Sequence, residues 1–146
     1  MEIKLGIGIE NIKFGLKPKD IENLLGKPNS IRKDEEYGEF EPMYIYNALQ
    51  LRLTFYKNHE DRLGYIRCSN KNLIINSQKV IGKPLKKVLG IFKKVTDDDW
   101  VLEEYDFWNQ YFNEKFWLIL SFNYDTLSEI EMGVPFKDDE QYNWPK

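Results

Sequence analysis

The sequence predicts an α+β fold of two pseudo-symmetric repeats, each a short helix packed on an antiparallel β-meander. Residues 7–68 and 73–134 share one order of features: an apolar helical stretch ending in glycine, an aromatic residue followed by asparagine, and a run of alternating apolar residues. Alternation with a period of two is typical of a strand with one buried face. Self-similarity of this kind indicates a duplicated unit whose two copies bury each other's apolar faces.

The first repeat is expected to open with a strand and a helix. Three isoleucines within residues 7–12 predict a short strand that ends at Gly15. Pro18 favours the first turn of a helix, where its missing N–H costs nothing, and Gly26 marks the end of that helix. About two turns of amphipathic helix are unstable alone, so we expect this helix to pack on a sheet.

The rest of the first repeat predicts a meander. The polar stretch 29–41 indicates a hairpin or a loop, and a strand is expected to begin at Met43. Residues 49–55 are apolar at every second position, which predicts a half-buried strand. A further strand is expected at 63–67.

The second repeat is expected to follow the same plan. Pro84 begins its helix and Gly90 ends it. Residues 116–122 alternate as their counterparts do, and 127–134 closes the sheet. The tail, residues 135–146, is polar apart from three aromatic residues, and it is expected either to pack as a loose cap or to be disordered.

Length and composition indicate a single domain spanning residues 1–146. A net charge of −3 and a pI near 5.3 argue against non-specific nucleic-acid binding, which needs a basic face. No apolar run approaches the ~20 residues of a membrane helix, and the N-terminal residues do not resemble a secretory signal. The lone Cys68 is expected to be reduced and buried. We therefore expect a cytoplasmic protein with no nucleic-acid or membrane partner.

The residues that carry enzyme chemistry are scarce. One histidine and one cysteine cannot supply the ligands of a zinc site, and Asp97–Asp99 lacks the spacing of a calcium-binding loop. His59 lies among charged turn residues, which favours a solvated loop position over a general base. We therefore expect no catalytic residues, no cofactor, no metal and no enzymatic activity.

Acidic and aromatic residues concentrate between positions 97 and 111. Aromatic anchors within a charged rim are typical of protein interfaces, and a weaker version of the pattern occurs near Tyr37. Alternatively, Trp100, Phe107 and Trp108 point into the core while the acids face water, and the sequence leaves both interpretations open. The candidate partner-binding residues are Asp97, Asp98, Asp99, Trp100, Glu103, Glu104, Tyr105, Trp108, Glu35, Glu36 and Tyr37.

Several stretches resemble a group of small bacterial proteins, some of which are immunity proteins of polymorphic or contact-dependent toxin systems. The matching residues are Ile12-Lys13-Phe14-Gly15-Leu16, then Ile21 with Leu24 to Pro28, and finally Leu63 with Ile66. The helix that ends in Leu-Gly-x-Pro is also similar to the repeat of β-lactamase inhibitor protein and of outer-membrane assembly lipoproteins. The chain departs from the lipoproteins because it lacks a lipobox cysteine, and no proline follows Gly90 in the second copy.

The resemblance implies a non-enzymatic inhibitor that occludes the active site of a cognate toxin. Its partner would be a basic, nuclease-type protein that the acidic segment steers into contact. Two alternatives remain: a small-ligand-binding protein or enzyme that uses an aromatic cleft between the repeats, and an adaptor that dimerises through a sheet edge. We expect a monomer or a weak dimer.

Overall fold

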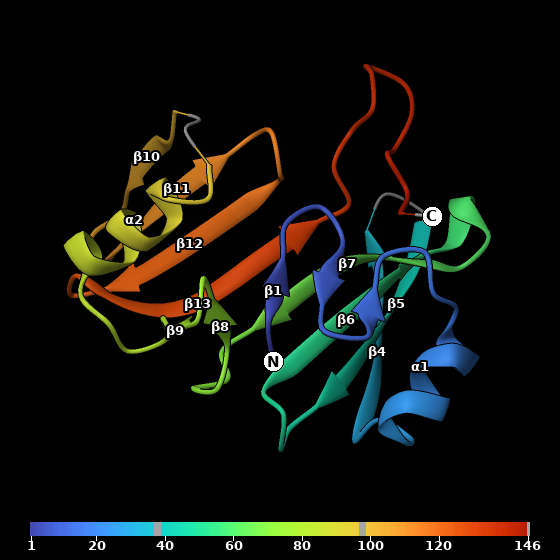
Figure 1. Cartoon of the computed structure of the whole chain (residues 1–146). Coiled ribbons are helices and arrows are strands. Elements are labelled where there is room, and N and C mark those ends of the chain that lie inside the picture. The colour runs from blue at the N-terminus through green and yellow to red at the C-terminus, as the bar shows by residue number, and fades with distance from the viewer. Residues whose placement is uncertain (37–38, 97–98, 146) are drawn as a thin grey trace.

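The fold is dominated by one antiparallel sheet of eight strands (Figure 1). The structure is a computed structural model, and it describes residues 1–36, 39–96 and 99–145. Across the sheet, the strands follow the order β10 (Val101–Glu104), β11 (Trp108–Asn113), β12 (Leu118–Asn123), β13 (Thr126–Gly133), β7 (Arg62–Cys68), β6 (Leu51–Tyr56), β5 (Glu39–Tyr46) and β4 (Ser30–Glu36).

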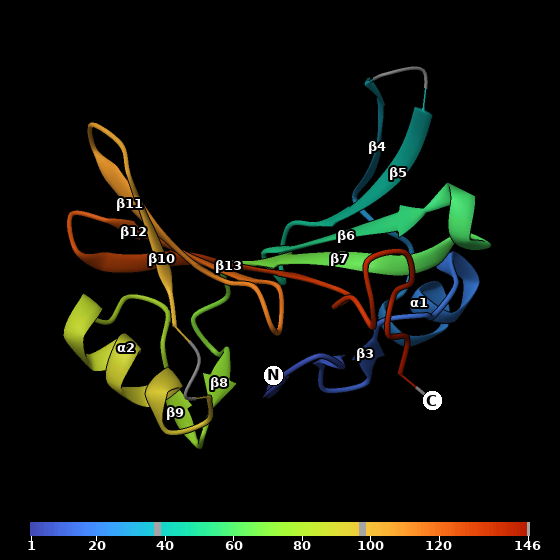
Figure 2. The ribbon, with the colours of Figure 1, turned by 90° about the horizontal axis from the view of Figure 1, so that it is seen from above.

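The helices and the short strands cover one side of this sheet (Figure 2). They are α1 (Pro18–Leu25), α2 (Leu85–Lys93), a three-stranded sheet of β1 (Ile3–Lys4), β2 (Gly8–Ile9) and β3 (Ile12–Lys13), and the pair β8 (Ile74–Ile75) and β9 (Gln78–Lys79). A single 3-10 turn, η1 (Lys57–His59), connects β6 and β7. None of the helices and short strands labelled in Figure 2 lies on the opposite side of the sheet, which we call the open face.

The hydrophobic core lies between the sheet and the helical layer. Alternate residues of β6 and β12 are buried, as their sequence pattern predicts; they are Leu51, Leu53 and Phe55, and Leu118, Leu120 and Phe122. Ile21 of α1 and Val88 of α2 are fully buried and belong to the same cluster. Both halves of the chain therefore share one core.

The predicted fold of two helix-plus-meander repeats is wrong. The structure is mostly β, and β13 pairs with β7, so that Ile130 opposes Cys68 and Met132 opposes Ile66. This pairing joins the meanders β4–β7 and β10–β13 into one continuous sheet instead of two separate units. Hydrophobic periodicity identifies strands but does not specify which free edges pair, which is why the sequence did not predict the large sheet.

The predicted bounds of the first helix are confirmed, whereas the second helix runs further than expected. Helix α1 begins at Pro18, and Gly26 follows it with a φ of 82°. Helix α2 passes through Gly90 and ends at Lys93. Ile91 and Phe92 are buried in the core, and this packing outweighs the ~1 kcal/mol preference against glycine inside a helix.

Other expectations about local structure have mixed outcomes. The stretch 29–41 contributes to β4 and β5, which agrees with the hairpin interpretation. The opening strand is replaced by the three short strands β1 to β3. No helix in the described ranges is long and apolar enough to span a membrane.

The C-terminal tail packs against the sheet as a cap. Its rings of Phe136, Tyr142 and Trp144 join an array that links the ends of both meanders. Tyr142 lies 5.6 Å from Tyr56 of β6 and 4.8 Å from Phe136, measured between ring centroids. Phe136 in turn lies 5.4 Å from Trp117, in the turn between β11 and β12.

Candidate functional site

The edge hairpin of β10 and β11 presents aromatic and acidic side chains to solvent. All eight residues from Val101 to Trp108 are exposed, and Phe107 keeps 71% of its surface accessible. Exposed apolar side chains on an edge strand favour association, because both the unpaired backbone and the apolar surface can bind another chain. We call residues 101–108 the acidic arm.

The tip of the acidic arm has a defined shape. The backbone N–H of Tyr105 donates to the carbonyl of Trp108 (2.9 Å), and the two rings stack with centroids 4.2 Å apart. The Tyr105 hydroxyl donates to Oε2 of Glu103 (2.9 Å). This hydrogen bond, and then the charge of Glu103, raises the pKa of Tyr105. The arm therefore carries a preformed aromatic surface with a carboxylate at its edge.

Alternation along β11 decides which face each side chain occupies. Tyr111 points toward the core, because its ring lies 5.6 Å from that of buried Phe122. The neighbours Gln110 and Phe112 therefore lie on the open face. Glu103 pairs with Gln110 in the register of β10 and β11, so it lies on the open face as well.

The structure brings four of the predicted contact residues together on the acidic arm: Glu103, Glu104, Tyr105 and Trp108. Asp99 is exposed just before the arm. Trp100 packs against the buried ring of Phe92, with centroids 5.8 Å apart, so it contributes to the core. Strand β10 (Val101–Glu104) lies within the stretch where acidic and aromatic residues concentrate.

The second predicted segment lies far from the first in the sheet. Glu35 and Glu36 belong to β4, which forms the sheet edge opposite β10. The two acidic segments are therefore separated by the full width of the sheet. Tyr37, Asp97 and Asp98 lie outside the described residues, as do the side chains of Glu35 and Glu36.

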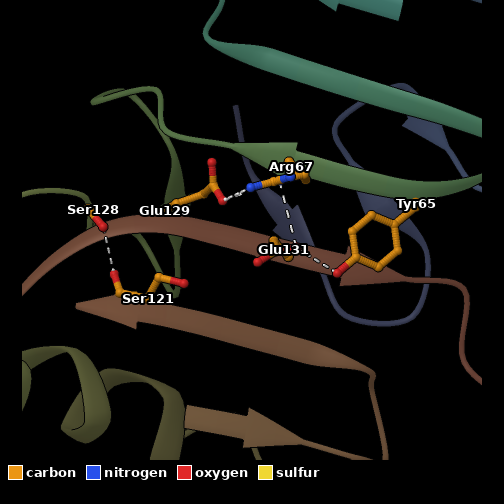
Figure 3. Close-up of polar contacts among 6 residues, drawn as sticks. All are labelled: Tyr65, Arg67, Ser121, Ser128, Glu129 and Glu131. Atoms are coloured by element: carbon orange, nitrogen blue, oxygen red, sulfur yellow. Dashed lines mark hydrogen bonds and ion pairs between the residues drawn. The ribbon is translucent and has the colours of Figure 1, made fainter. Parts of the chain in front are cut away.

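A charged network occupies the junction of β7 and β13 on the open face (Figure 3). Arg67 donates to Oε1 of Glu129 through Nη2 (2.9 Å) and Nε (3.3 Å), and its Nε lies 3.7 Å from Oε1 of Glu131. The hydroxyl of Tyr65 donates to Oε1 of Glu131 (2.8 Å). This junction is where the two halves of the chain meet in the sheet.

The partial burial of this network shifts two pKa values. Burial, followed by the charge of Glu131 and the hydrogen bond to it, raises the pKa of Tyr65 far above its ordinary value. Burial acts to lower the pKa of Arg67, but the hydrogen bond to Glu129 and the charges of both glutamates outweigh it and raise that pKa. The network is therefore held with Tyr65 neutral and Arg67 charged.

Sequence reasoning did not single out these four residues. The sequence pattern that could have indicated them is the alternation of polar and apolar positions. Tyr65 and Arg67 alternate with buried residues of β7, and Glu129 and Glu131 alternate with buried residues of β13. A polar hollow of about 210 Å³ lies beside the network. It is lined by Ile45, Tyr46, Asn47, Gln50, Leu51, Arg52, Arg67, Ser69 and Glu129.

His59, which was expected in a solvated turn, is half-buried among aromatic rings. It lies 5.0 Å from Tyr142 and 6.2 Å from Trp144, measured between ring centroids. Arg62 donates through Nε to the backbone carbonyl of His59 (3.0 Å), and its guanidinium lies over Trp144. This setting assigns His59 a packing role at the end of the sheet.

Two further observations concern groups that could support catalysis. Cys68 is buried, and burial raises the pKa of its thiol, which lowers its reactivity. Within residues 1–36, 39–96 and 99–145, no three His, Cys, Asp or Glu side chains are grouped to hold a metal ion.

Comparison with known proteins gives a likeness in fold. No family model and no curated protein matches the sequence. Among solved structures, the chain resembles an extracellular protein containing a SCP domain from Bacillus anthracis str. Ames, with a TM-score of 0.54 and 14% sequence identity. The match covers 86% of this chain and 44% of that protein, so the present chain spans less than half of its length. At this identity the likeness concerns the fold alone.

Proposed function

We propose that this protein is a non-enzymatic protein-binding module whose acidic arm contacts a basic partner. The observation that carries the proposal is the run of eight exposed residues from Val101 to Trp108, in which aromatic and apolar side chains are interleaved with carboxylates. Aromatic side chains supply most of the binding energy in many interfaces, while charges raise the association rate and select the partner. The arm combines both kinds of side chain on one edge hairpin.

The sequence resemblance to immunity proteins makes a cognate nuclease-type toxin the partner that we favour. Nucleases present basic surfaces, because they bind phosphate groups. An acidic arm would steer such a surface into contact, and the bulk of the module would then block access to the active site. This mechanism requires binding and occlusion, and it requires no chemistry from the module.

Site-specific photo-crosslinking would test the contact surface directly. p-Benzoyl-phenylalanine is placed at position 107 in one variant and at position 124 in another, and both are irradiated in native cells. Tyr124 is a matched control because it is 81% exposed and lies in the turn between β12 and β13. We expect the variant at position 107 to crosslink one basic protein, and the variant at position 124 not to crosslink that protein. Equal labelling from both positions, or none from 107, would contradict the proposal.

Association kinetics with the purified crosslinked partner would then test the steering role of the carboxylates. The variant Glu103→Gln/Glu104→Gln is compared with Asp139→Asn/Glu140→Gln, which changes the net charge equally at exposed positions in the tail. We expect the arm variant to associate roughly tenfold more slowly at low salt, and the difference to shrink at high salt. An association rate that depends equally on both pairs would rule out a local role for the arm.

A further inference from the structure

The net charge of −3 conceals a strongly basic segment. Residues 62–96 contain nine lysines and arginines and no aspartate or glutamate, which leaves 12 basic and 24 acidic residues for the rest of the chain. The next ten residues, 97–106, contain six acids and no basic residue. Basic and acidic residues are thus separated along the chain, and the net charge of the whole chain describes neither segment.

Helix α2 gathers four of these lysines on its outer face. Val88, Ile91 and Phe92 are buried against the core. At 100° per residue, the opposite face of the helix carries Lys86, Lys87, Gly90 and Lys93, and the C-cap residue Lys94 continues this face; all five are exposed. We call these four lysines the lysine face.

The four ammonium groups of the lysine face lack ion-pair partners among the residues that the structure describes. Within the described ranges, none of them forms a hydrogen bond with another side chain. Lys79 of β9 and Lys71, which precedes β8, are also exposed. Strands β8 and β9 lie on the same side of the sheet as α2 (Figure 2). Four like charges without partners attract a dense anionic surface.

The lysine face and the carboxylate of Glu103 lie on different sides of the sheet. Helix α2 lies on the covered side of the sheet (Figure 2), whereas Glu103, which pairs with Gln110, lies on the open face. An anionic surface would therefore attract the lysine face and repel the acidic arm. Binding would have a preferred orientation, with the open face directed away from that surface.

The composition of the lysine face favours a lipid surface over a nucleic acid. Lysine acts as a hydrated point charge, whereas phosphate and base recognition in nucleic acids commonly uses the bidentate guanidinium of arginine. The face contains no arginine, and the segment 71–96 has no exposed aromatic side chain on which a base could stack. Clusters of four to eight lysines on an amphipathic helix are typical of binding to anionic phospholipids.

We propose that the lysine face of α2 docks this protein peripherally onto membranes rich in anionic phospholipid. Attraction would be electrostatic, because the apolar residues of α2 are committed to the core. This inference does not depend on the protein partner: the lipid is bound on the covered side of the sheet, and the acidic arm remains accessible.

Vesicle flotation would test the inference without any partner present. The wild-type chain is mixed with vesicles of phosphatidylcholine containing about one third phosphatidylglycerol, and in parallel with pure phosphatidylcholine. We expect flotation with the anionic vesicles only, and release as NaCl rises from about 0.1 M to about 0.5 M. Absence of flotation at the lower salt concentration would overturn the proposal.

Two quadruple variants would localise the binding. Lys86→Gln/Lys87→Gln/Lys93→Gln/Lys94→Gln is compared with a control that removes four exposed lysines elsewhere: Lys13→Gln/Lys19→Gln/Lys27→Gln/Lys137→Gln. Each lysine near an anionic surface contributes about fivefold to partitioning, so the α2 variant should partition several hundredfold less. Circular dichroism would confirm that both variants are folded.

Three outcomes of this comparison would overturn the proposal. The first is an equal loss of partitioning in both variants. The second is tighter binding of the wild type to a fluorescent DNA duplex than to the anionic vesicles at the same salt concentration, which would assign the lysine face to nucleic acid. The third is lysine-dependent self-association in sedimentation velocity without vesicle binding, which would assign it to the acidic arm of a second copy.

Discussion

A single methyl group added at Gly133 is expected to destabilise the sheet where Trp117 covers it. The Trp117 ring lies on the backbone of Gly133, so an alanine Cβ would stand 2.4 Å from Cδ1 and 3.1 Å from Nε1 of that ring. The backbone of Gly133 lies outside the left-handed region, so alanine meets no conformational penalty there. The steric contact alone would therefore produce the effect, and the ring would have to move.

The Trp117 ring cannot move without disturbing its neighbours. It lies edge-to-face with Phe112 at 5.0 Å and with Phe136 at 5.4 Å. Overpacking of this kind commonly costs 1–3 kcal/mol, and we expect Gly133→Ala to lower the free energy of unfolding by about 2–3 kcal/mol. For a domain of this size, that loss lowers Tm by roughly 4–12 °C.

Urea unfolding monitored by circular dichroism would measure this effect. Gly90→Ala is the control, because nothing lies within 4 Å of the added Cβ, and alanine inside α2 should stabilise the protein by about 0.5–1 kcal/mol. Adding Gly133→Ala to Trp117→Ala should cost little beyond Trp117→Ala alone, since the clash is then absent. A Gly133→Ala variant that unfolds at the wild-type urea concentration would refute the reasoning.

Three other predictions concern the network and the tail. Arg67→Met should lower the free energy of unfolding by about 1–2 kcal/mol in urea, because two half-buried carboxylates lose their cation, and adding Glu129→Gln should recover part of the loss. Tyr65 has a raised pKa in the folded state, so the unfolded chain releases this proton first as pH rises above about 10. Unfolding free energies should therefore fall with pH above that value, and less steeply in Tyr65→Phe. Tyr142→Ala should cost about 2–3 kcal/mol in the same assay because four rings contact it, whereas exposed Tyr124→Ala should stay within about 0.5 kcal/mol.

Local patterns in the sequence predicted individual elements well. Apolar alternation located β6 and β12, and Pro18 with Gly26 bounded α1. These signals succeed because they act within a few residues. Gly90 misled the prediction of α2, since the burial of Ile91 and Phe92 is a tertiary effect that local propensity does not contain.

The features that a single sequence did not reveal depend on long-range pairing. The contact between β7 and β13 brings Tyr65 to Glu131, 66 residues away. The acidic and aromatic character of the arm was visible in the sequence, but its position at a sheet edge was not. The sequence likewise could not decide that Trp100 packs on Phe92 while Phe107 remains exposed.

The joint between β7 and β13 also has a consequence for the order of folding. Strands within each meander are linked by short turns, so their hairpins can form early at a small entropic cost. The joint must instead close a loop of about 60 residues, and its contacts gain nothing until both meanders exist. We therefore expect the pairing of β7 with β13 to form late in folding. The ion pair of Arg67 and Glu129 would then form between two meanders that are already folded.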